Sequence, residues 1–183
     1  MKINCLPGGL IVFTPTVHLD DRGYFLESFN KELMAKYGIT NEFVQDNQSC
    51  SKKNVARGFH FQNPPYDQAK LVRVVKGSVI DYAMDLRKSS KTYGQVTYVK
   101  LTDGNFRQFY IPRGFAHAFV ALEDDTVFTY KCDNYWNKES EGCILFEKQY
   151  LLDTSDFIDY DSLIFSDKDK CGEQLSGFET QFI

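Results

Sequence analysis

Two of the three histidines, His60 and His117, lie in segments that also carry other reactive side chains. A neutral imidazole has an ordinary pKa of about 6.5, so it can exchange a proton near neutral pH or bind a metal ion. The third histidine, His18, precedes two aspartates and is expected to lie in a surface loop. His60 and His117 are therefore the candidates for chemistry, although each taken alone could equally be a hydrogen-bonded structural residue.

The segment around His60, residues 56–62 (ARGFHFQ), has the pattern of a β-strand. Side chains two positions apart in a strand share a face. We therefore expect Gly58, His60 and Gln62 on one face. Phe59 and Phe61 would then lie on the other.

Two stretches that each contain glycine and histidine, 58–77 and 104–117, resemble the two motifs of cupins. Cupins often bind a metal through two histidines and a glutamate of the first motif and one histidine of the second. Here Gln62 stands where the second histidine would be, and no glutamate lies between His60 and Gly77. One ligand from each motif is too few for a stable site, which usually has about three or four. The resemblance therefore predicts a mainly β, cupin-type barrel (jelly roll) with a few short helices, no metal and no cofactor.

Longer motifs, in register from about residue 9 to residue 169, resemble the dTDP-4-dehydrorhamnose 3,5-epimerase family. Several such motifs in the right order are far more specific than one short pattern. The matching segments are 22–29 (RGYFLESF), 44–49 (VQDNQS), 57–62 (RGFHFQ), 70–77 (KLVRVVKG), 81–90 (DYAMDLRKSS), 111–117 (IPRGFAH) and 166–169 (SDKD).

The resemblance implies an epimerase that inverts C3, C5 or both in a nucleoside-diphosphate 4-keto-6-deoxy sugar. Protons on the carbons beside a ketone are acidic, because the resulting anion delocalises onto the ketone oxygen. Matched to the family, His60 is the base and Tyr130 is the acid on the opposite face of the sugar. Lys70 would stabilise the enolate oxygen, and Asp169 would orient the imidazole.

The resemblance also implies that His117 and Asp81 hold the site together. Each catalytic candidate has a structural alternative when it is considered alone. Lys70 could face solvent, Tyr130 could be a core aromatic with a satisfied hydroxyl, and Asp169 could be one more surface acid. The combination of motifs favours the functional interpretation.

Nucleotide binding is implied by the same resemblance. A diphosphate needs cationic donors, and Arg57 matches one of them. Arg22 matches a second that crosses from the partner subunit, which implies a homodimer. Tyr135 or Trp136 would stack on the base. The residues that match the lining of the nucleoside site are Phe25, Glu27, Gln45 and Asn47.

The composition limits the kinds of binding partner and the cellular compartment that we expect for this protein. The net charge of −4 provides no basic field for nucleic acid. We expect no membrane segment, because no stretch approaches about 18 apolar residues. The apolar run at 9–13 is ended by Pro15 and lacks the length of a signal peptide. Five scattered cysteines without a C-x-x-C pair favour reduced thiols, and we therefore expect a cytoplasmic protein.

The elements that must position these residues are mostly strands in a single domain, residues 1–183. A helix capped by Asn30 is expected to end at Gly38. Strand-like runs at 72–75 and 79–84 flank a glycine turn, and those at 95–101 and 106–111 flank Asp103-Gly104. Both pairs predict β-hairpins. Further strands are expected at 118–122 and 127–130, and residues 151–183 as a C-terminal extension packed on the barrel.

Departures from the family pattern leave the substrate open. Ala56 and Phe59 stand where leucines are frequent, Cys50 where arginine is common and Asp67 where a small residue is usual. The sugar could be a hexose or a heptose, the base thymine or guanine, and inversion could be single or double. A ketoisomerase of the same fold and a non-catalytic sugar-nucleotide binding module remain as alternatives. Tyr130 favours epimerisation, since inversion needs an acid on the second face.

Overall fold

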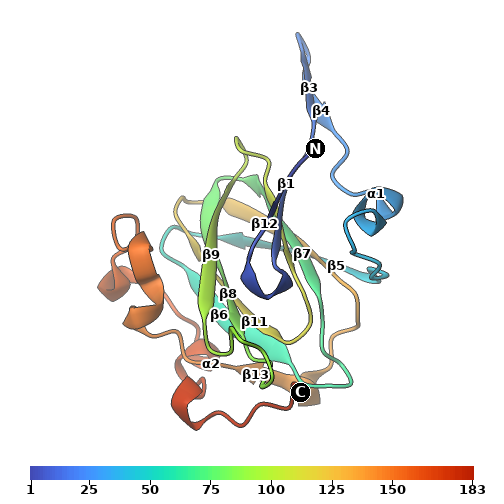
Figure 1. Ribbon diagram of the computed structural model, residues 1–183. Coiled ribbons are helices and arrows are strands. Elements are labelled where there is room, and N and C mark those ends of the chain that lie inside the picture. The colour runs from blue at the N-terminus through green and yellow to red at the C-terminus, as the bar shows by residue number, and fades with distance from the viewer.

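The computed structural model describes residues 1–183, except for the side chain of Leu152, and its strands form two main sheets and a separate hairpin (Figure 1). One sheet has the order β1 (Lys2–Cys5), β2 (Ile11–Thr14), β10 (Gln108–Ile111), β7 (Lys70–Lys76), β12 (Thr126–Cys132) and β5 (Gln45–Ser51). The other has the order β13 (Glu141–Cys143), β6 (Ala56–Gln62), β11 (Phe115–Ala121), β8 (Ser78–Asp85) and β9 (Val96–Thr102). The hairpin consists of β3 (Val17–Asp20) and β4 (Gly23–Leu26).

The prediction of a mainly β fold with short helices is confirmed. Paired strands in the sheets are antiparallel, and the two sheets face each other without closing into one hydrogen-bonded barrel. The α-helices are α1 (Lys31–Ala35) and α2 (Asp167–Lys170). The 3₁₀ turns are Pro7–Gly9, Lys138–Ser140, Lys148–Thr154, Tyr160–Ser162 and Leu175–Gly177. None of these helical segments is long and apolar enough to cross a membrane.

Helix α1 begins where its sequence predicts. The Asn30 side chain accepts a hydrogen bond from the Leu33 backbone N–H at 3.0 Å, which satisfies a donor left free at the helix start. Gly38, with φ of +84°, turns the chain away after the last helical turn. Met34 is buried beside Tyr110 and Leu71, and so the helix packs on the outer face of the six-stranded sheet.

Both predicted hairpins are wrong. Strand β7 pairs with β10 and β12 in the six-stranded sheet, whereas β8 pairs with β9 and β11 in the five-stranded sheet. The turn at Gly77 and the turn at Asp103-Gly104 therefore carry the chain across from one sheet to the other. The physical reason is burial on both faces. Every residue of β8 is buried, which suits the middle of a covered sheet rather than a two-stranded ribbon.

Two apolar cores enclose the five-stranded sheet. The inner core fills part of the space between the sheets and includes Val72, Phe119 and Phe128. The outer core lies between the sheet and the chain that follows β13, and it includes Phe59 and Tyr82 of the sheet. The C-terminal extension, orange to red in Figure 1, runs along this side of the molecule. The chain between β13 and the extension contributes Phe146 and Tyr150 to the outer core, and the extension contributes Leu151, Ile158 and Phe182.

Candidate active site

A cavity of about 200 Å³ lies between the two sheets, beside the inner core. Most of the residues selected from the sequence meet here. Those that line it are His60, His117 and Arg57 from the five-stranded sheet, Lys70, Tyr130, Gln45 and Asn47 from the six-stranded sheet, and Trp136 from the loop after β12.

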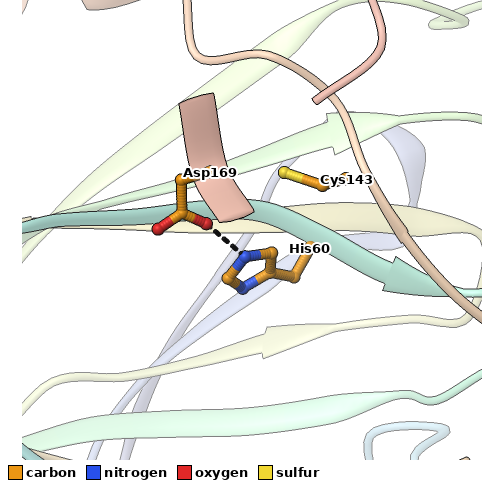
Figure 2. A group of neighbouring side chains, drawn as sticks. All are labelled: His60, Cys143 and Asp169. Carbon is orange, nitrogen blue, oxygen red and sulfur yellow. Dashed lines mark hydrogen bonds and ion pairs between the residues drawn. The ribbon is translucent and has the colours of Figure 1, made fainter. Parts of the chain in front are cut away.

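The imidazole of His60 is paired with a carboxylate from the C-terminal extension. Its Nε2 lies 2.5 Å from Oδ1 of Asp169, which comes from α2 (Figure 2). The other oxygen of Asp169 accepts a hydrogen bond from the Ser166 hydroxyl at 2.6 Å. Burial by itself raises the pKa of Asp169, but the hydrogen bonds from His60 and Ser166 outweigh it and lower that pKa. The carboxylate therefore stays ionised, and Nδ1 of His60 points away from it (Figure 2).

A bulge in β6 decides which side chains join His60. His117 pairs with His60 and Phe119 with Arg57, so one extra residue of β6 is accommodated between these pairs. The extra residue brings Arg57 onto the cavity side with His60, which simple alternation does not predict. Gly58 makes the bulge feasible, because a Cβ at this position would overlap the backbone of His117. The predicted faces of His60 and Gln62 against the two phenylalanines are confirmed. The prediction that Gly58 shares the face of His60 is wrong, because the bulge turns this position towards Ala118 of the outer core.

The wall opposite His60 carries Lys70 and Tyr130. Lys70 lies on β7 directly across from Cys132 of β12, two residues beyond Tyr130. Burial lowers the pKa of the Lys70 ammonium, although the nearby Asp81 carboxylate opposes the shift. Burial also raises the pKa of the Tyr130 phenol, so its hydroxyl is protonated at neutral pH and able to donate.

His117 and Asp81 form a buried pair at the floor of the cavity. Nε2 of His117 lies 3.0 and 2.9 Å from the two carboxylate oxygens of Asp81. Burial raises the pKa of Asp81, although the contact with His117 works against the rise. Asp81 is not among the residues that line the cavity, whereas His117 is, and the charge of Asp81 opposes the lowering of the Lys70 pKa.

Gln62 has a role that the sequence did not reveal. Its amide donates to the carbonyls of Tyr66 at 2.5 Å and Tyr135 at 3.2 Å, and its carbonyl accepts from the Asn137 N–H at 2.7 Å. The side chain thereby fastens the loop that carries Trp136 to the strand that carries His60. Because this amide is committed to backbone groups, Gln62 cannot replace the second histidine of the cupin motif as a metal ligand.

The two aromatic candidates for base stacking differ. Trp136 lines the cavity, and its backbone N–H donates to the side-chain oxygen of Gln45 at 3.0 Å. Tyr135 is 63% exposed and lies outside the residues that line the cavity. Trp136 is therefore the better placed of the pair.

Three candidates lie away from the cavity of their own chain. Arg22 is at the tip of the β3–β4 hairpin, where it pairs with Asp20 at 2.6 Å and its side chain is 90% exposed. Phe25 lies on β4, Glu27 directly follows that strand, and both are also exposed. The hairpin projects from the body of the molecule (Figure 1).

Strand β13 supplies two polar neighbours that no sequence signal marked. Its register sets Glu141 opposite Gln62 and Cys143 opposite His60. Glu141 lines the cavity and accepts from Lys168 at 2.6 Å. Burial raises the pKa of the Cys143 thiol to about 12, and so this residue is a neutral thiol beside the histidine.

A larger hollow of about 410 Å³ lies on the outer face of the six-stranded sheet. Asp46, Arg73 and Lys131 contribute charges to it, and Tyr130 borders both spaces. His60 and Lys70 line the smaller cavity, which therefore holds the groups able to move a proton and stabilise an anion.

Comparison with known proteins agrees with this arrangement. The family model described as dTDP-4-dehydrorhamnose 3,5-epimerase matches residues 6–177. The chain is 45% identical over 169 residues to the dTDP-4-dehydrorhamnose 3,5-epimerase of Shigella flexneri, covering 91% of each chain. It is 44% identical over 167 residues to that of Methanothermobacter thermautotrophicus, covering 88% of this chain and 87% of the relative. The epimerase from Legionella pneumophila, solved with dTDP-4-keto-L-rhamnose, superposes with a TM-score of 0.89 at 39% identity, covering 97% of this chain and 94% of that one.

Proposed function

Because this chain belongs to the dTDP-4-dehydrorhamnose 3,5-epimerase family and is accordingly an isomerase, we propose that His60, Lys70 and Tyr130 carry out its reaction. The reaction is inversion beside the ketone of a nucleoside-diphosphate 4-keto-6-deoxy sugar, at C3, C5 or both. In this proposal residues 1–183 act as one domain, and the cavity between the sheets is the active site.

The observation that carries the proposal is the position of His60 and Tyr130 on opposite walls of one cavity. His60 belongs to the five-stranded sheet and Tyr130 to the six-stranded sheet. A sugar ring held between the sheets presents one face to each residue. Inversion requires removal of a proton from one face and delivery to the other, which is the arrangement these two groups offer.

The first step in this account is removal of a proton by Nδ1 of His60. Asp169 at Nε2 holds the ring and stabilises the imidazolium that forms, as in other histidine–carboxylate pairs. The electron pair left on carbon delocalises onto the ketone oxygen. The Lys70 ammonium then stabilises the resulting enolate, in a site where burial strengthens its interaction with charge.

The second step is delivery of a proton from the Tyr130 hydroxyl to the opposite face. Its raised pKa keeps the phenol protonated until the enolate is present. His117 and Asp81 are assigned a positioning role, because they form a buried pair in the sheet of His60, with His117 directly opposite His60 in the strand register.

The size of the cavity suggests that it holds only the sugar part of the substrate. About 200 Å³ is below the roughly 300–1,000 Å³ of typical ligand pockets, so it suits the sugar, with the nucleotide at its mouth. Arg57 is assigned to the diphosphate, and Trp136 to the base. Gln45 and Asn47 are assigned to the nucleoside. Because the relatives act on dTDP sugars, a thymidine-linked hexose is the first substrate to test. Guanosine-linked sugars and heptose sugars are tested next.

We further propose a homodimer in which the β3–β4 hairpin of one subunit completes the site of the other. Leu19 and Phe25 on this hairpin are 78% and 69% exposed, although an isolated two-stranded ribbon gains little stability alone. Contact with a second copy would cover these side chains and bring Arg22 to the partner's diphosphate. A cytoplasmic location is proposed because the five cysteines of the described chain are free thiols.

Mixing two inactive variants tests the exchange of hairpins. Arg22→Ala and His60→Asn chains are unfolded together, refolded together and assayed. If Arg22 acts on the partner's site, each mixed dimer contains one complete site and activity returns. If Arg22 acts within its own chain, every site in the mixture lacks one of the two residues, and activity stays absent.

The proposed reaction is tested by incubating the protein in heavy water with nucleotide-linked 4-keto-6-deoxy sugars and following it by NMR. We expect deuterium to enter at C3, at C5 or at both, and an inverted product to form. Migration of the carbonyl instead would indicate a ketoisomerase. Tight binding without any exchange would indicate a binding module and contradict the proposal.

A further inference from the structure

The thiol of Cys143, a residue type that binds soft metal ions, lies next to His60, the proposed base. Strand β13 pairs with β6 so that Cys143 is directly opposite His60. One ligand atom each from His60, Cys143 and Asp169 lie within 4.8 Å of one another. Figure 2 shows the three side chains converging from β6, β13 and α2. The three residues together are called the thiol triad below.

The thiol triad has the composition of a zinc site. Zinc is bound in proteins by thiolate, imidazole and carboxylate, often by three such ligands with a fourth position open. Ligand atoms on one zinc ion are roughly 3.5 Å apart, given bonds of about 2.0–2.3 Å. Nε2 of His60 and Oδ1 of Asp169 are now 2.5 Å apart and share a proton. A cation that replaces this proton needs the two atoms to separate by only about 1 Å.

The surroundings suit a cation that enters from the cavity. The side chain of His60 is 36% exposed, which leaves a path for entry, whereas that of Asp169 is 4% exposed. Ser166 holds the other oxygen of Asp169 and keeps the carboxylate directed at the triad. Two anionic ligands, a thiolate and a carboxylate, balance the charge of a divalent ion.

We propose that the thiol triad captures a thiophilic divalent cation, such as Zn²⁺ or Cd²⁺, and that capture switches off the base. Binding releases the thiol proton to solvent, and the proton shared between His60 and Asp169 moves to Nδ1 of the ring as the cation takes its place at Nε2. With the cation on Nε2, Nδ1 carries the single hydrogen of the neutral ring, so it no longer accepts a proton from the sugar. The working enzyme is then the metal-free form, and the cation is a reversible inhibitor. The inhibition rests on the function proposed above, whereas the binding does not.

The binding is measured on the full chain without substrate. Cd²⁺ is titrated into the reduced protein, and the ultraviolet charge-transfer band of the cadmium–thiolate bond is recorded. The variants are Cys143→Ser, with Cys143→Ala as a second version if serine impairs folding, and Cys5→Ser as a matched exposed control. We expect the Cys5→Ser protein to retain the tight site and both Cys143 variants to bind at least tenfold more weakly. Equal binding by the Cys143 variants would overturn the proposal.

The inhibition is measured as solvent-proton exchange with and without Zn²⁺. We expect the wild-type rate to fall with one equivalent of Zn²⁺ and to return on chelation, with Mg²⁺ having no effect. The Cys143→Ser protein should keep its own metal-free rate at the same Zn²⁺ concentration. Equal sensitivity of this variant would overturn the proposal. If the protein proves to have no exchange activity, the cadmium titration still decides the site, so failure of the two proposals is distinguishable.

Discussion

The space between the two sheets has an apolar end and a polar end, and the same strands build both. At the apolar end, the rings of Phe119 and Phe128 stack with centroids 4.3 Å apart, and Val72 packs beside them. At the polar end, the inward-facing residue two positions along each strand is instead reactive. On β7, the reactive Lys70 lies two positions from the apolar Val72. On β12, Tyr130 lies two positions from Phe128, and on β11, His117 lies two positions from Phe119.

This difference indicates that one part of each strand stabilises the fold and the next part carries the reactive side chains. A side chain two positions further on keeps the same orientation, so the packing of the apolar end fixes the direction of the reactive groups. The two ends adjoin, since the rings of Phe128 and His117 are stacked with centroids 6.0 Å apart. Polar groups held for chemistry add little stability, whereas the apolar end supplies it. Substitutions at the two ends should therefore separate activity from stability.

The largest expected effect is on activity, at the polar end. His60→Asn should lower solvent-proton exchange by at least about 10²–10⁴-fold, because it removes the base and leaves a side chain that can still contact Asp169. Its unfolding free energy should stay within about 1 kcal/mol of wild type. Denaturant unfolding and NMR exchange on one preparation measure the two quantities. Wild-type turnover by a folded variant would refute the assignment of His60.

The largest effect on stability should come from the apolar end. Phe128→Ala removes a ring that is 1% exposed and leaves a cavity against Phe119. We expect a loss of about 3–5 kcal/mol in unfolding free energy. Chemical denaturation measures it, with Phe128→Leu as the milder control. A loss below about 1 kcal/mol would mean that the apolar end does not support the fold as described.

The buried carboxylate of Asp85 lies outside the cavity, and we expect its substitution to change stability, as at the apolar end. Asp85, at the end of β8, is buried, which raises its pKa, but hydrogen bonds from Arg87, Ser90 and Thr92 lower it to about 2. The folded pKa is thus below the ordinary 3.8, so this contribution is present above about pH 4 and is lost as pH falls towards about 2. Asp85→Asn should cost about 2 kcal/mol at neutral pH.

The measurement is unfolding free energy against pH for the wild type and for Asp85→Asn. The wild-type curve should fall more steeply between about pH 4 and pH 2, and the two curves should converge at the acid end. Parallel curves would show that Asp85 is not held by the network around Arg87.

Alternation and turn residues predicted the strands well, but not their partners. The faces of His60 and Gln62, the cap at Asn30 and the mainly β class followed from local pattern. The turns at Gly77 and Gly104 look like hairpin turns because a change of sheet uses the same local chemistry. Which sheet a strand joins depends on contacts between residues far apart in the sequence. Such contacts cannot be recognised from a segment of about ten residues.

The composition of the cavity shows the same limit. Arg57 reaches it through a bulge, and Cys143 reaches His60 through pairing with β13. Neither a bulge nor a register has a signature in the segment concerned. The ties made by Gln62 to the loop at Tyr135 are also non-local, so only its identity, and not its partners, was open to prediction.

The most direct test of the account uses Tyr130→Phe, which removes the proposed acid from one wall and leaves the base on the other. Two rates are measured on one sample: deuterium exchange beside the ketone by NMR, and inverted product by chromatography. We expect exchange to persist, because His60 and Lys70 remain, while the inverted product falls by at least about tenfold, or roughly 1.4 kcal/mol in barrier. Equal loss of both rates, or loss of neither, would contradict catalysis from two opposite walls.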